Sequence, residues 1–178
     1  VQPTADGGYI IAGHRDGFGS GTGDVYLIKT DASGNMTWSR TLGGAGGDAG
    51  YSVRQTADGG YIITGWTNIT SFGQGSGDVY LVKTDASGNM TWQKTFGGTG
   101  GDMAYSVQPT ADGGYIIGGT TQSFGAGGWD VYLIKTNSSG NLTWSQTFGG
   151  ASDDWGYSVQ PTADGGYIIA GYTASFGA

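Results

Sequence analysis

The sequence contains four copies of one ten-residue phrase, and their spacing limits the fold more than any other feature. At steps of 52, 54 and 52 residues, TADGGYIIAG or a close variant of it begins at Thr4, Thr56, Thr110 and Thr162. At steps of 54 and 52 residues, the phrase DVYL begins at Asp24, Asp78 and Asp130. A chain whose segments all recur at one period folds into copies of one supersecondary unit, which bury their apolar faces by stacking.

Each period predicts four β-strands. In the second copy these are YSVRQ from Tyr51, YIITGWT from Tyr61, DVYLVKT from Asp78 and MTWQKTF from Met90. They are rich in the β-branched and aromatic residues that strands favour. The phrases TADGG and DASGN separate them as tight turns, since Asp-Gly and Gly-Gly tolerate the positive φ angles that primed hairpin turns need.

The composition agrees with an all-β fold. The chain has 39 Gly, and all 14 of its acidic residues are Asp, so the helix former Glu is absent. No window repeats apolar residues at the helical spacing. The glycines occupy fixed places between aromatic and β-branched segments, which excludes a disordered chain.

Four antiparallel strands in every period are typical of a β-propeller blade. We therefore predict one repeat array over residues 1–178, with three complete blades and the first half of a fourth. The predicted boundaries are about 1–50, 51–104, 105–156 and 157–178. Closed propellers have at least four blades. We expect the array to belong to a larger or an oligomeric propeller, completed by further blades of the same protein or by self-association.

The phrase TFGGASDDWGYSVQPTADGGYIIAGYTASFG resembles the repeat of SBBP-type β-propellers of bacteria and archaea. It is also similar to related repeats in archaeal surface proteins. The resemblance covers the whole chain and implies a seven-bladed fold in a secreted or surface-exposed protein. It implies no activity, because the family carries no catalytic signature that could be transferred.

One tryptophan follows the second turn of each complete period. A ring at this place can wedge between neighbouring blades, or it can offer a platform to a ligand; we favour the packing role for Trp38, Trp92 and Trp144.

Charge and composition exclude several function classes. The net charge is −7 and the seven basic residues are dispersed, so the basic stripe that nucleic acid requires is missing. The sequence contains no run of 18 apolar residues, so it predicts no insertion into a membrane. His14 is the only histidine and there is no cysteine, so neither a catalytic triad nor a histidine metal cluster can form. We expect no enzyme activity.

The loops that join successive periods, GGAGGDAG, GGTGGDMA and GGASDDWG, combine aspartate with free backbone carbonyls, which suits calcium. The calcium candidates are Asp48, Asp102, Asp153 and Asp154. The alternative is that these side chains cap turns through their own backbone; we expect no other cofactor.

Two further charged positions recur in every period. The aspartates that begin DVYL are expected to bond loop amides or to pair with Lys or Arg; they are Asp24, Asp78 and Asp130. The lysines five residues later are expected on solvated faces; they are Lys29, Lys83 and Lys135.

Every asparagine begins an Asn-X-Ser/Thr sequon, which predicts a glycosylated outer-surface protein. The five are Asn35, Asn68, Asn89, Asn137 and Asn141. For Asn35, Asn89 and Asn141 the alternative is a role in the SGN turn.

Differences between the copies gather in the loops that precede DVYL and in those that join the periods, and a propeller brings both sets to one face. The candidate contacts there are His14, Arg15, Asp16, Trp66, Asn68, Trp129 and Trp155. We expect a non-enzymatic structural or adhesive module on the outside of a bacterial or archaeal cell, with surface glycans or proteins as partners. The alternative is a carbohydrate- or calcium-dependent ligand-binding propeller.

Overall fold

The computed structural model describes residues 1–16, 23–68 and 76–176. These residues form fourteen β-strands in four antiparallel sheets, and no α-helix occurs among them. The described part of the chain therefore has no helix with the length and apolarity to cross a membrane.

Four strands in chain order make each of the first three sheets, and two strands make the last. The first sheet contains β1 (Gln2–Pro3), β2 (Tyr9–Arg15), β3 (Asp24–Thr30) and β4 (Met36–Leu42). The second contains β5 (Asp48–Gln55), β6 (Tyr61–Thr67), β7 (Asp78–Thr84) and β8 (Met90–Phe96). The third contains β9 (Asp102–Pro109), β10 (Tyr115–Thr121), β11 (Asp130–Thr136) and β12 (Leu142–Phe148). The last contains β13 (Asp154–Pro161) and β14 (Tyr167–Thr173).

The predicted strands are confirmed in the second sheet. β6, β7 and β8 begin at Tyr61, Asp78 and Met90, as the sequence indicates. β5 begins three residues before the predicted Tyr51, because Asp48 already pairs with Thr67 of β6.

The prediction of primed hairpin turns is wrong. In the first turn the N–H of Gly7 donates to the carbonyl of Thr4 at 2.9 Å, and Gly7 has φ 83°. No described residue other than glycine has a positive φ, so the Asp before Gly7 keeps an ordinary backbone conformation. This is the type I turn followed by a left-handed glycine, the usual form of a slightly longer hairpin loop.

The first strand of each later sheet contains a β-bulge. In β5 the register shifts between Gly50 and Ser52, so that Tyr51 has no partner on β6. The same shift leaves Tyr105 of β9 and Tyr157 of β13 unpaired. A bulge re-aims its side chain, and here it places one tyrosine from each of the three sheets outside the regular ladder.

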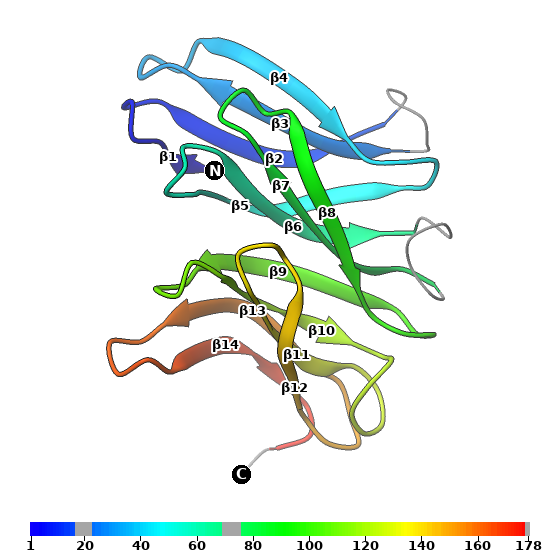
Figure 1. The fold of residues 1–178 in the computed structure, drawn as a ribbon. Coiled ribbons are helices and arrows are strands. Elements are labelled where there is room, and N and C mark those ends of the chain that lie inside the picture. Colours follow the sequence, from blue (N-terminus) through cyan, green and yellow to red (C-terminus); the bar gives the residue numbers. More distant parts are fainter. Residues whose placement is uncertain (17–22, 69–75, 177–178) are drawn as a thin grey trace.

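The sheets stack in chain order, from β1–β4 at the top of Figure 1 to β13–β14 at the bottom. Ile10 and Leu27 of the first sheet pack against Val53 and Ile63 of the second. Equivalent apolar layers lie between the second and third sheets and between the third and the last. Along one side β5 contacts β9 and β9 contacts β13, whereas the fourth strands of the described sheets share no comparable contact.

Candidate functional site

The two sets of variable loops meet at one end of the stack, which we call the loop end. The N–H of Asp48 donates to the Gly23 carbonyl at 2.8 Å, and the N–H of Asp102 donates to the Gly77 carbonyl at 2.8 Å. In both cases the loop that enters β3 or β7 binds the loop that enters the next sheet. In each sheet the turn between the first and second strands and the turn between the third and fourth strands lie at the opposite end. We call this the turn end (Figure 1).

Two hollows open between the sheets at the loop end. One, of about 320 Å³, lies between the first and second sheets and is lined by His14, Asp16, Asp48, Tyr51, Trp66 and Asn68 among others. The second, of about 300 Å³, lies between the second and third sheets and is lined by Trp66, Asp102, Met103, Gln122 and Trp129 among others. The structure thus brings five of the seven contact candidates to the two hollows.

The bulge tyrosines form a row of aromatic rings beside these hollows. Tyr51 stacks on Tyr105 with centroids 5.6 Å apart, and Tyr105 meets the edge of Tyr157 at 5.6 Å. Burial, together with the two neighbouring tyrosines, raises the pKa of Tyr105 to about 12. Trp155 lies 5.1 Å from Trp129 and 6.4 Å from Tyr105 and joins the row. Sequence reasoning missed the tyrosines, although the phrase YSV, which occurs three times at the repeat spacing, was their signal.

Arg15 packs against an aromatic ring, and its two neighbours face solvent. His14 and Asp16 are exposed, and the Arg15 guanidinium lies over the Tyr26 ring at 5.2 Å. In the described part of the chain, no three His, Cys, Asp or Glu side chains converge on one point.

The aspartates that begin β5, β9 and β13 cap the loops before them. The Oδ2 atoms of Asp48, Asp102 and Asp154 accept the N–H groups of Gly44, Gly98 and Gly150 at 2.9, 3.0 and 2.9 Å. Asp153 is exposed, and its Oδ1 accepts the Trp129 N–H at 3.0 Å. Asp48, Asp102 and Asp154 therefore cap a turn of their own loop, as the alternative interpretation expects, whereas Asp153 binds the loop before β11 instead.

The aspartates that begin β3, β7 and β11 are buried. Asp130 accepts the Ala126 N–H at 3.0 Å, as expected of a loop-binding residue. The other expected partner, a Lys or Arg, is not found beside Asp24 or Asp130 among the described residues. Burial raises the pKa of both carboxyls, and repulsion from Asp154 adds to it for Asp130.

The predicted solvated lysines are also wrong. The side chains of Lys29, Lys83 and Lys135 are only 6%, 7% and 6% exposed. Each Nζ lies 2.8 Å from the aspartate of the first hairpin turn in its own sheet, namely Asp6, Asp58 and Asp112. The stem is buried between sheets and the ammonium ties the turn to the third strand.

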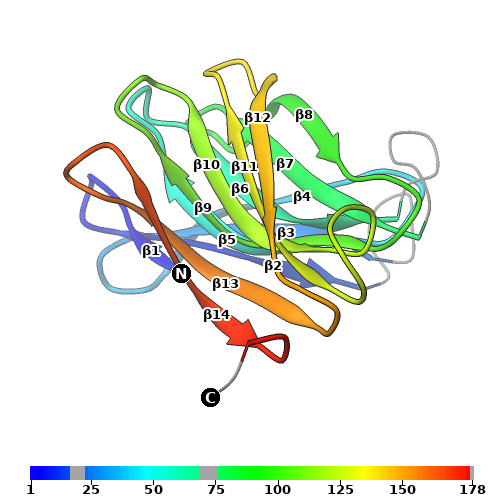
Figure 2. The ribbon, with the colours of Figure 1, turned by 90° about the horizontal axis from the view of Figure 1, so that it is seen from below.

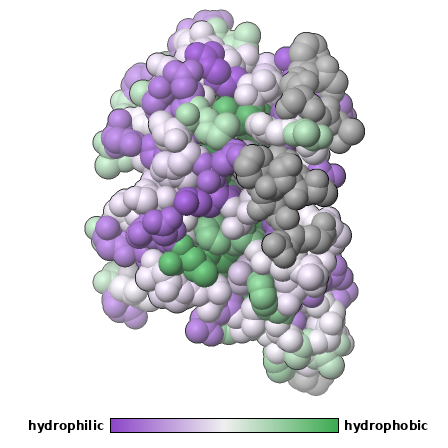
Figure 3. Space-filling model, turned by 45° about the vertical axis from the view of Figure 1, so that its right-hand side comes forward, coloured by the Kyte–Doolittle hydropathy of each residue, from purple (hydrophilic) through white to green (hydrophobic). Residues whose placement is uncertain are grey.

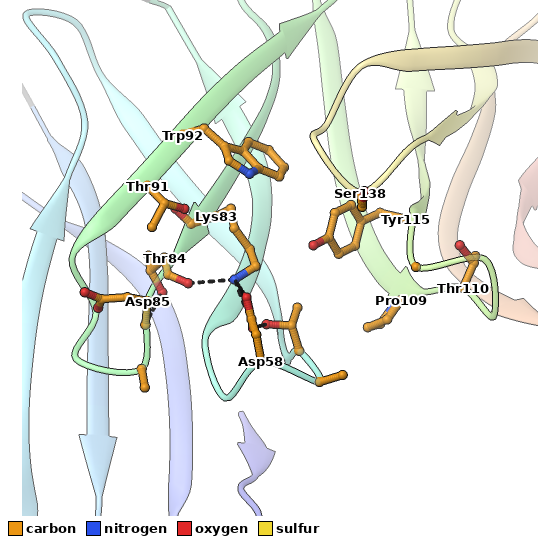
Figure 4. Close-up of a pocket in the computed structure, with 14 residues that line it drawn as sticks. Asp58, Lys83, Thr84, Asp85, Thr91, Trp92, Pro109, Thr110, Tyr115 and Ser138 are labelled. Atoms are coloured by element: carbon orange, nitrogen blue, oxygen red, sulfur yellow. Dashed lines mark hydrogen bonds and ion pairs between the residues drawn. The ribbon is translucent and has the colours of Figure 1, made fainter.

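A cleft of about 560 Å³ lies at the turn end between the second and third sheets. Figure 4 shows Lys83 bonded to Asp58 and to the Thr84 carbonyl on one side, with Trp92 above and Tyr115 opposite. The Lys–Asp and Trp–Tyr contacts that line this cleft recur at the other two interfaces, so its lining is a repeated packing feature.

The tryptophans of the fourth strands lie across the sheet interfaces. Each ring sits about 6 Å from a tyrosine of the next sheet: the pairs are Trp38–Tyr61 at 5.9 Å, Trp92–Tyr115 at 6.0 Å and Trp144–Tyr167 at 5.9 Å. A Cβ added at Gly88 would meet Trp38 at 2.7 Å, so the ring also touches the next sheet's second turn.

Four of the sequon asparagines serve turns. The amide groups of Asn35 and Asn89 donate to Asp31 and Asp85 at 3.0 and 2.9 Å. Asn137 takes the place of those aspartates, and its Oδ1 accepts the N–H of Asn141 at 3.0 Å. Asn68 accepts the Gly47 N–H. All five asparagines are exposed, and glycosylation stays a prediction.

The outermost sheets leave apolar faces uncovered. Ile10, Ile62 and Ile116 are 0% exposed, but the equivalent Ile168 of β14 is 61% exposed. At the other end, Tyr9 of β2 is 42% exposed, whereas Tyr61 and Tyr115 are 2% and 4% exposed. In Figure 2, β13 and β14 form the nearest layer. Figure 3 shows hydrophobic residues gathered in patches between hydrophilic ones.

Known proteins similar to the chain give a fold and no function. No protein-family model matches it. It is 27% identical over 157 residues to the regulatory protein FlaEY of Caulobacter vibrioides; the match covers 75% of this chain and 16% of that protein. A Bacteroides caccae protein of unknown function has a similar structure, with a TM-score of 0.54 at 13% identity, over 89% of this chain and 50% of the other.

Proposed function

We propose that the chain is part of a β-propeller scaffold outside the cell, and that it completes its stack by binding further sheets of the same kind. In an isolated preparation of residues 1–178, those sheets come from a second copy. In this account the protein has a structural or adhesive role and no catalytic one. The open faces at the two ends of the stack carry the proposal.

The open face of the last sheet differs from the open face of the first sheet. At each of its three inner interfaces, the chain packs a face of the one kind against a face of the other. Ile116 lies in a core cluster with Tyr167 and Ile169 of the next sheet. Ile168 is the repeat equivalent of Ile116, and Tyr9 and Ile11 are the equivalents of Tyr167 and Ile169. A second copy can therefore place its first sheet on β13–β14 and reproduce an interface that the fold already uses.

A head-to-tail contact of this kind joins different surfaces and leads to a ring or an open array. The contacts between first strands, without comparable contacts between fourth strands, favour wedge-shaped layers that turn around an axis. These contacts and the 52- to 54-residue period support a propeller.

The test is the mass in solution of the 18.1-kDa chain and of an Ile168→Asp variant. We expect the parent chain to associate, and the variant to dissociate at least tenfold more readily, since a carboxylate cannot be buried unpaired. Met36→Asp is the matched control. Met36 is 63% exposed, and its equivalents Met90 and Leu142 are exposed in the inner sheets too. A parent chain that stays monomeric at high concentration would contradict the proposal.

The aromatic row favours a second function, which is carbohydrate binding at the loop end. Trp66, Trp129 and Trp155 are half-buried, and Tyr51 and Tyr157 are exposed. Their rings and the neighbouring polar groups form the mixture of apolar walls and few polar groups that small-ligand sites use. Saturable binding to an immobilised glycan, lost in a Trp155→Ala variant, would support this function.

A further inference from the structure

A pair of carboxylates lies at the loop end of each sheet interface. A Cβ added at Gly43 would fall 2.5 Å from Asp24 Oδ1 and equally close to Asp48 Oδ2. One added at Gly97 would fall 2.5 Å from Asp102 Oδ2 and closer still to Asp78. Two carboxylates from successive sheets thus face one glycine, and only glycine leaves room for both.

These carboxylates are buried. Asp24 and Asp48 are each 2% exposed, Asp78 is 3% exposed and Asp102 is fully buried. Among the described residues, no lysine or arginine pairs with Asp24, Asp48 or Asp102, since the three ion pairs lie at the turn end. Two buried like charges side by side repel and lack the hydration they would have in water.

Both pairs also leave oxygens without a partner among the described residues. Asp24 Oδ2 and Asp48 Oδ1 in the first pair, and Asp102 Oδ1 in the second, are buried and accept no hydrogen bond there. Burial raises the pKa of Asp24 and of Asp48, and the neighbouring Asp24 raises that of Asp48 further. A buried acceptor without a donor costs about 1–3 kcal/mol, so repeating this arrangement needs a compensating ligand.

We propose that the Asp24–Asp48 and Asp78–Asp102 pairs each bind one Ca²⁺ ion, which holds neighbouring sheets together at the loop end. Oxygen-only donors without cysteine or histidine suit a hard cation. Backbone carbonyls of the loops that join successive sheets, residues 43–47 and 97–101, would supply the remaining ligands together with water. The hollows described above reach Asp48 and Asp102 and give an ion a path from solvent.

The third pair is expected to bind calcium more weakly. Asp154 lies beside Asp130 at Gly149, but both of its oxygens already accept hydrogen bonds, from Thr173 on Oδ1 and from Ser175 and the Gly150 N–H on Oδ2. The Ser175 and Thr173 hydroxyls lower the pKa of Asp154 to about 2. This carboxylate is stabilised without a metal, so we expect two strong sites in each chain.

The experiment titrates calcium chloride into the EDTA-treated chain, with heat of binding and melting temperature as readouts. We expect about two equivalents to bind. We expect the melting temperature to rise by about 10–20 °C once calcium exceeds the dissociation constant of both sites a hundredfold.

An Asp24→Asn variant sharpens the test because removing one carboxylate has opposite effects with and without metal. In EDTA the variant should melt at a higher temperature than the parent, since the repulsion is gone. In calcium it should bind one equivalent fewer. Asp153→Asn is the control: Asp153 is exposed, the new side chain can still accept the Trp129 N–H, and two equivalents should still bind.

Two results would overturn the proposal. One is a titration without heat or change in melting temperature. The other is calcium binding that survives the combined Asp24→Asn and Asp102→Asn substitutions. If mild acidification raises the melting temperature of the parent chain and calcium does not, each pair shares a proton instead.

Discussion

Aspartate supplies all the negative side chains of this protein, and burial and hydrogen-bond partners decide the direction in which its pKa shifts. At the turn end Asp58 has a side chain that is 64% exposed and bonds the Lys83 ammonium. Lys83 and then Thr56 lower the pKa of Asp58 to about 2. At the loop end burial raises the pKa of Asp24. The pKa of one residue type thus shifts in opposite directions in two neighbouring sheets.

The Asp58–Lys83 pair predicts a pH dependence. Because the folded-state pKa of Asp58 is about 2 and its ordinary value is 3.8, ionised Asp58 stabilises the fold above about pH 4. That contribution is lost as the pH falls towards 2. Urea unfolding of the parent and an Asp58→Asn variant should therefore differ most above pH 4 and converge near pH 2. A difference that stays constant down to pH 2 would show that the ion pair contributes nothing.

The lysines show a residue environment that the sequence alone did not predict. Lys83 follows the apolar run 79–82, and a polar residue at the end of such a strand is interpreted as facing water. In the stack both faces of the inner sheets are covered, so the stem is buried and only the ammonium finds a carboxylate. Each turn aspartate precedes its lysine by about two dozen residues. This recurring spacing was the signal in the sequence that the two side chains could pair.

At the scale of strands and turns, the repeat predicted where β6, β7 and β8 begin, because aromatic and β-branched runs between Asp-Gly turns leave few alternatives. It could not predict the turn type, since Asp-Gly fits both primed turns and a type I turn with a left-handed glycine. Nor could it place the bulge at Tyr51. That bulge depends on how β5 pairs with β6, which is a matter of register rather than composition.

The bulge explains a repeated glycine and predicts a matched pair of variants. A Cβ at Gly65 of β6 would collide with the Ala49 carbonyl of the bulged strand, whereas one at Gly13 of β2 meets nothing within 4 Å. We expect Gly65→Ala to destabilise the fold by about 1–3 kcal/mol. Gly13→Ala should be neutral or stabilising by up to about 1 kcal/mol.

Urea denaturation of the two variants checks this prediction. Equal midpoints for Gly65→Ala and the parent chain would mean that the bulge can shift without cost, and that it is not a fixed element of the sheet. A large loss in Gly13→Ala would mean that β2 is more crowded than the structure shows.

At the scale of the whole molecule, the stack of sheets ends in two open apolar faces. The inner interfaces show how such faces are covered. Burying a side chain such as Ile168 is worth about 1.5–3 kcal/mol, and several apolar groups lie on each open face. The repeat period alone predicted that sheets of this kind need neighbouring sheets. The stacking order and the Ile–Tyr layer that fixes how two sheets meet required the structure.

The most direct test is disulfide cross-linking, which is clean because the chain has no cysteine. In a doubly substituted Ile11→Cys, Ile168→Cys chain, mild oxidation should link position 11 of one copy to position 168 of the next. Each single variant should give no such link. Mass spectrometry of the linked peptides reads out the partners. Links between two copies of position 168, or none at concentrations where the chains associate, would contradict the repeated head-to-tail interface.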